Sequence, residues 1–134
     1  MNEQIKECAK NLGEAIAASE PVKDYLAAKT AYETDPVLSA ALQEYGAQRM
    51  ALGEEQMKDT AMQDLDLMKK IEERIGALYT QITTSDAYLN LRAAQEAINL
   101  LMQSVNSEIN FYAFGERPCT HDCSSCSADC ASRG

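Results

Sequence analysis

The chain has 134 residues, of which 46% are hydrophobic and 6% are aromatic. This balance fits one globular or helical-assembly domain and excludes a globally disordered chain. The sequence is rich in Ala, Leu, Glu, Gln and Met, which favour helices, and poor in residues that favour sheets, so it predicts an all-α fold. Its formal net charge of −9 repels phosphate backbones and argues against direct binding of nucleic acid.

The N-terminal residues predict a cytoplasmic protein. Met1-Asn2-Glu3-Gln4 is not the basic region followed by an apolar run that begins a secretory signal. No stretch approaches the roughly 18 apolar residues that a membrane-spanning helix requires. We therefore expect no membrane contact, and cysteines that are kept reduced.

Two helices are expected first. Apolar residues at helical spacing predict one helix over residues 3–18, with Cys8 on its apolar face as a small buried side chain. Ser19 is the predicted N-cap of a second helix, which has Pro21 in its first turn and runs to about Glu33.

Two more helices follow in the middle of the chain. Asp35-Pro36 combines a capping carboxylate with a proline at the first helical position, and Gly53 is the predicted stop of this third helix. Residues 60–63 have the form of a capping box before a fourth helix. The apolar positions of the fourth helix are Leu65, Met68, Ile71, Ile75, Leu78 and Ile82.

The longest helix is predicted from Asp86 to about Ala113. Its apolar residues alternate in steps of three and four, as in a heptad seam that packs against one or two long helices. The seam consists of Tyr88, Leu91, Gln95, Ile98, Met102, Val105, Ile109 and Tyr112. Leu89, Leu100 and Leu101 widen it, so we expect packing against the fourth helix and a further, intermolecular face.

Residues 1–114 are thus predicted to form an antiparallel bundle of about five helices with a long C-terminal helix. Residues 115–134 contain almost no apolar side chains besides cysteine, so they are predicted to form a separate, flexible, cysteine-rich segment. The bundle should be dimeric or larger, because a thin antiparallel hairpin leaves apolar surface open.

The cysteine-rich segment is the strongest functional signal. Cys119, Cys123, Cys126 and Cys130 have the spacing C-x3-C-x2-C-x3-C. Four thiolates satisfy an iron–sulfur cluster, most readily [4Fe-4S], or a zinc ion, for which His121 could replace one cysteine. A redox-active or unliganded thiol segment is the third alternative. In a helix these cysteines would form a single row, which cannot surround one ion but could serve a cluster shared with another chain.

The first three cysteines also match the cluster motif of radical S-adenosylmethionine enzymes, but so short a helical chain lacks the barrel of such an enzyme. The chain has no second histidine, no G-x-S-x-G, no phosphate loop and no H-E-x-x-H. The carboxylate pairs Glu54-Glu55 and Glu72-Glu73 are expected to be solvated surface. We predict a protein that is not an enzyme and has no small-molecule substrate.

Several short patterns resemble the YlbF/YmcA family of bacterial proteins over about residues 3–112. They are Leu12-Gly13-Glu14-Ala15-Ile16, Ser19-Glu20, the helix start at Asp35-Pro36, and a long amphipathic helix that ends Ile98…Val105-Asn106…Ile109. The C-terminal cysteines resemble the YlbF-like members rather than the YheA-like branch.

The resemblance implies a helical bundle that forms a homodimer or a hetero-oligomer with YmcA-like and PSP1-domain (YaaT-like) proteins. It further implies a regulatory adaptor in competence, sporulation and biofilm control, linked to mRNA processing by RNase Y, with cluster ligands among the four C-terminal cysteines. The alternative, from the residues alone, is a small zinc-binding or metal-transfer protein that dimerises through its bundle.

Overall fold

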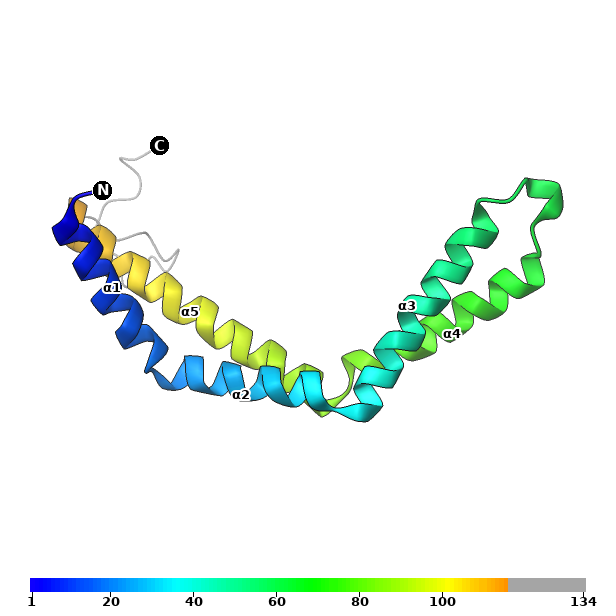
Figure 1. Ribbon diagram of the computed structural model, residues 1–134, viewed down its shortest axis with the longest axis horizontal. Coiled ribbons are helices and arrows are strands. Elements are labelled where there is room, and N and C mark those ends of the chain that lie inside the picture. Colours follow the sequence, from blue (N-terminus) through cyan, green and yellow to red (C-terminus); the bar gives the residue numbers. More distant parts are fainter. Residues whose placement is uncertain (116–134) are drawn as a thin grey trace, which may run out of the picture. The chain divides into compact units, whose positions relative to one another are not determined.

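The computed structural model describes residues 1–115, and the all-α prediction is confirmed. Five α-helices, one 3-10 turn and no strand occur within those residues (Figure 1). The elements are α1 (Glu3–Ala17), α2 (Glu20–Thr34), α3 (Pro36–Gln56), η1 (Thr60–Met62), α4 (Leu65–Thr83) and α5 (Asp86–Phe114). As predicted, α5 is the longest of them, with 29 residues.

The chain divides into two units, Met1–Ile98 and Asn99–Gly134. The first unit contains α1 to α4 and the first half of α5, and the described part of the second unit is the remainder of α5. The predicted domain boundary at Gly115 coincides with the last described residue, so it stays a prediction.

The helix starts follow local capping chemistry. The Asp35 carboxylate accepts hydrogen bonds from the backbone N–H groups of Val37 and Leu38, both at 3.0 Å, and so caps α3 as predicted. Ser19 precedes α2 as its N-cap, but its side chain makes no capping bond. The Ser19 hydroxyl instead donates to a carbonyl in the last turn of α1.

Two predicted helix boundaries are wrong. Gly53 does not end α3, which continues to Gln56, because a glycine inside a helix only weakens it and does not stop it. Residues 60–63 do not cap α4: Thr60–Met62 form a 3-10 turn, and Asp64 takes the N-cap position by accepting from the N–H of Leu67 at 3.0 Å. The glycine that does end a helix is Gly115, whose positive φ of 73° is the left-handed conformation of a C-terminal cap.

The core lies between α3 and α4, which run antiparallel to each other as a hairpin (Figure 1). Leu38 and Ala41 on α3 meet Leu78 and Ile82 on α4, and all four are buried. Five partly buried side chains complete this cluster: Tyr32, Leu42, Tyr45, Ala87 and Tyr88. The core therefore joins α3 and α4 to the end of α2 and the start of α5 within the first unit.

The α5 seam is correct in part, but its predicted packing along the fourth helix is wrong: α4 packs against α3, and only the start of α5, at Ala87 and Tyr88, packs against that core. Tyr88, Leu91, Ile98 and Val105 are half-buried as predicted, and Leu89 and Leu100 are exposed, as expected of a wide apolar stripe. Four predicted seam residues, Gln95, Met102, Ile109 and Tyr112, are exposed, whereas Ala94 is buried and Leu101 is half-buried. The apolar stripe of α5 is wider than the face that other parts of the protein cover. Spacing alone therefore could not decide which residues within the stripe face the protein interior.

The prediction that Cys8 is buried is wrong. Cys8 is exposed, as are all of residues 1–15. An amphipathic helix buries its apolar face only where another element covers it. Because α2 leads away from the end of α1 and does not fold back along it (Figure 1), α2 leaves Cys8 uncovered.

Candidate functional site

The predicted metal ligands Cys119, Cys123, Cys126, Cys130 and His121 lie outside the described residues, so their role stays a prediction. Within residues 1–115, no group of three or more His, Cys, Asp or Glu side chains could hold a metal ion. The site that the structure does describe is the α3–α4 hairpin, which has a groove along one side and a hydrogen-bonded turn at its closed end.

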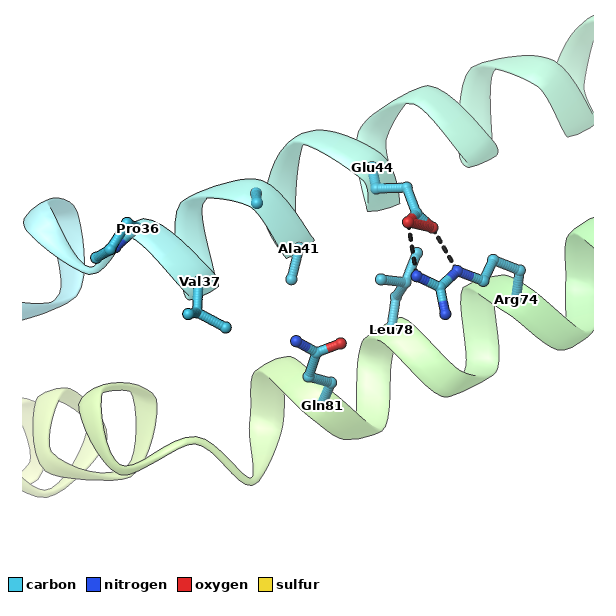
Figure 2. Close-up of a pocket in the computed structure, with 8 residues that line it drawn as sticks. Pro36, Val37, Ala41, Glu44, Arg74, Leu78 and Gln81 are labelled. Atoms are coloured by element: carbon cyan, nitrogen blue, oxygen red, sulfur yellow. Dashed lines mark hydrogen bonds and ion pairs between the residues drawn. The ribbon is translucent and has the colours of Figure 1, made fainter.

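The groove has a volume of about 420 Å³. Helix α3 contributes one wall and α4 the other (Figure 2). Its lining consists of Pro36, Val37, Ala40, Ala41 and Glu44 from α3, with Arg74, Leu78 and Gln81 from α4. The groove is mainly apolar, and its charged side chains are one glutamate and one arginine.

Those two charges neutralise each other. Two guanidinium nitrogens of Arg74 donate to the Glu44 carboxylate in a bidentate pair, with 2.6 Å between Nη2 and Oε1 (Figure 2). The hydrogen bond from Arg74 lowers the pKa of Glu44, and the same bond raises the pKa of Arg74. An exposed pair adds little stability, but its fork geometry holds α3 and α4 in register. The two charged side chains that line the groove are therefore paired with each other.

The closed end of the hairpin is organised by Glu55. Its side chain is buried, at 5% exposure, and it accepts two hydrogen bonds of 2.8 Å, from the Lys58 ammonium and the Asp64 backbone N–H. These bonds, the Lys58 bond first, lower the pKa of Glu55. The same ion pair raises the pKa of Lys58. Glu55 thus ties the end of α3 to the start of α4.

Gln63 also holds the connector between α3 and α4 in place. Its side-chain amide donates to the backbone carbonyls of Gln56, at 3.1 Å, and Lys58, at 3.0 Å. The carbonyl of Gln56, the last residue of α3, and the carbonyl of Lys58 in the connector thereby gain partners that the helix itself does not supply. The connector between α3 and α4 is held by side-chain hydrogen bonds rather than by apolar packing.

The sequence prediction missed this network. Glu55 was expected to be solvated surface together with Glu54, but only Glu54 is exposed. The spacing of Glu55 and Lys58, three residues apart, indicates an ion pair on a helix. The spacing does not indicate that the Glu55 carboxylate also accepts the Asp64 N–H at the start of α4. That contact forms only because the connector brings Asp64 back beside the end of α3.

The Glu55 network predicts a pH-dependent stability. A carboxylate whose pKa is lowered by folding stabilises the fold at pH values above its ordinary pKa of about 4.3, and this contribution is lost as the pH falls through the lower folded value. Glu55→Gln should therefore lower the melting temperature at pH 7, and the difference from wild type should shrink below about pH 4. Thermal unfolding followed by circular dichroism at both pH values measures this.

Glu54→Gln is the matched control for that experiment, because it removes one charge from the adjacent, exposed position. It should leave the melting temperature almost unchanged at both pH values. Equal destabilisation by the two variants at pH 7 would mean that general acidity, and not the Glu55 hydrogen bonds, sets the stability.

Comparison with protein families assigns these helices. A family model described as control of the competence regulator ComK, YlbF/YmcA, matches residues 5–111, which include almost all of α1 to α5. The chain belongs to the YlbF/YmcA family. The predicted resemblance is thereby confirmed, and membership of the YlbF/YmcA family supports a regulatory role for this chain.

The four C-terminal cysteines of this YlbF/YmcA chain lie beyond the matched residues. Comparison with curated proteins and with solved structures finds no significant match. None of the helices within residues 1–115 of this YlbF/YmcA protein has both the length and the apolar composition of a membrane-spanning segment.

Proposed function

We propose that this YlbF/YmcA protein is a regulatory adaptor that acts by binding other proteins. The observation that carries the proposal is the extent of apolar surface on its helices. Large apolar side chains are exposed on α1, at Ile5, and on α5, at Leu89 and Leu100, besides the aromatic side chains Tyr112 and Phe114 near its end. Apolar surface of this extent on a small protein is typical of an interface.

The proposed partners are a YmcA-like protein and a PSP1-domain (YaaT-like) protein, in a cytoplasmic hetero-oligomer that controls competence, sporulation and biofilm formation and is linked to RNase Y. Homodimerisation is the simpler form of the same assembly. The family assignment supports this proposal through its description as control of a competence regulator.

The proposed cofactor is an iron–sulfur cluster, [4Fe-4S], with Cys119, Cys123, Cys126 and Cys130 as ligands. The spacing of the four thiols supports it. The same spacing favours a second candidate function, a small zinc-binding or metal-transfer protein, in which His121 could complete a Cys3His site.

Anaerobic co-purification tests both candidates. The tagged full-length chain, expressed together with YmcA-like and PSP1-domain proteins, should retain both partners through a salt wash and should contain iron and sulfide, with broad absorption near about 400 nm. A colourless protein with stoichiometric zinc and no retained partner would support the metal-transfer function. A protein with neither metal nor partner would contradict both candidates.

A further inference from the structure

The closed end of the α3–α4 hairpin combines two kinds of surface that the adaptor proposal has not used. We name residues 54–66 the hairpin tip. Met57, Met62 and Leu65 are exposed there, at 89%, 72% and 71%. Two of these three are methionines, whose unbranched and polarisable side chains adapt to apolar surfaces of different shape. The tip therefore carries exposed apolar side chains outside the core.

The hairpin tip is also strongly acidic. It contains five acidic residues and one lysine, namely Glu54, Glu55, Asp59, Asp64 and Asp66 with Lys58. The lysine pairs with Glu55 at 2.8 Å, and five carboxylates against one ammonium leave the hairpin tip with a negative net charge. Glu54, Asp59 and Asp66 are exposed. A partner that covers Met57 and Met62 would therefore meet negative charge around them.

The backbone of the hairpin tip is already ordered. Glu55 accepts from the N–H of Asp64, and Gln63 donates to the carbonyls of Gln56 and Lys58. A surface that is held in place before binding loses less conformational entropy when a partner docks. The network thus presents the exposed methionines at defined positions without burying them.

We infer that the hairpin tip is a docking site for a basic amphipathic helix of a partner protein, an inference that rests on the proposed adaptor function. The apolar face of such a helix would cover Met57, Met62 and Leu65, and its Lys and Arg side chains would lie near Glu54, Asp59 and Asp66. The acidic charge excludes a nucleic-acid backbone or an anionic membrane as the occupant, because both would be repelled.

A binding assay with a synthetic peptide tests the inference. The probe is a fluorescent helical peptide of leucine and lysine in a heptad pattern. The control peptide has glutamate in place of each lysine. Fluorescence anisotropy with the full-length protein should detect the lysine peptide and not the glutamate peptide. The triple variant Met57→Gln, Met62→Gln, Leu65→Gln should weaken binding of the lysine peptide by about tenfold or more, because it removes most of the covered apolar surface.

Matched variants separate the hairpin tip from the general acidity of the chain. Glu54→Gln with Asp59→Asn changes the net charge by the same amount as Glu72→Gln with Glu73→Gln, and all four positions are exposed. Only the first pair should weaken binding of the lysine peptide. Leu26→Gln, at an exposed position of α2, controls for the loss of apolar surface elsewhere and should bind as wild type does.

The inference would be overturned by any of three results. The two pairs of charge variants could weaken binding equally, the triple variant could bind as wild type does, or the wild type could fail to bind the lysine peptide. Circular dichroism of every variant confirms that the helices remain folded.

The co-purification experiment reports separately on the adaptor function. If the wild type retains its partners but the hairpin tip variants bind the peptide normally, the tip inference fails alone. If the peptide binds through the tip and no partner is retained, the proposed adaptor function fails alone.

Discussion

Replacing Leu78 by alanine is expected to lower the free energy of unfolding by about 2–5 kcal/mol. Leu78 is the most deeply buried large side chain of the described residues, at 1% exposure, and it contacts the core formed with Leu38, Ala41 and Ile82. Truncating Leu78 removes apolar contacts and leaves a cavity. Because the core between α3 and α4 is small, few neighbouring side chains can move to fill that cavity. Urea unfolding followed by far-UV circular dichroism measures the change.

Leu65→Ala is the matched control for Leu78→Ala. It makes the same chemical change in the same helix at an exposed position, so it should alter the free energy of unfolding by no more than about 0.5 kcal/mol. If both variants were equally destabilised, the core would not lie between α3 and α4 in solution.

Deleting residues 116–134 is expected to abolish metal binding and to leave the helices intact. The deleted segment contains four of the five cysteines and the single histidine of the chain, and its low apolar content gives it little surface to pack. Iron, sulfide and zinc analysis after anaerobic purification should show complete loss of bound metal. Helicity and the melting temperature of the metal-free protein should stay almost the same as in the full chain.

Replacing the four C-terminal cysteines by serine should reproduce the loss of metal without shortening the chain. Cys8→Ser is the control, because Cys8 is exposed on α1 and is not among the proposed ligands. Full metal content in the four-serine variant would show that the ligands have been assigned to the wrong residues. A loss of metal in Cys8→Ser would add Cys8 to the ligand set.

The helix starts were predictable because they depend on a few adjacent residues. Pro36 has no backbone N–H that would be left unpaired at the first helical position of α3. The Asp35 carboxylate accepts hydrogen bonds from two of the backbone N–H groups that follow. The ends were less predictable: the end of α5 before Gly115 agrees with the prediction, but Gly53, the predicted stop of α3, lies inside that helix. A glycine permits either outcome, and the residues around it decide which one occurs.

The sequence by itself determined that the chain is all-α, where most of its helices begin, and which family it belongs to, because helix propensity, capping and apolar spacing are local properties. Only the tertiary structure decided that Ala94 and Leu101 are covered in place of Gln95 and Met102, and that Cys8 is exposed. It also decided that Glu55 is a buried cap of the returning chain, bonded to the backbone at Asp64. These three outcomes depend on which element covers which face, and a pattern of apolar residues along one helix does not contain that information.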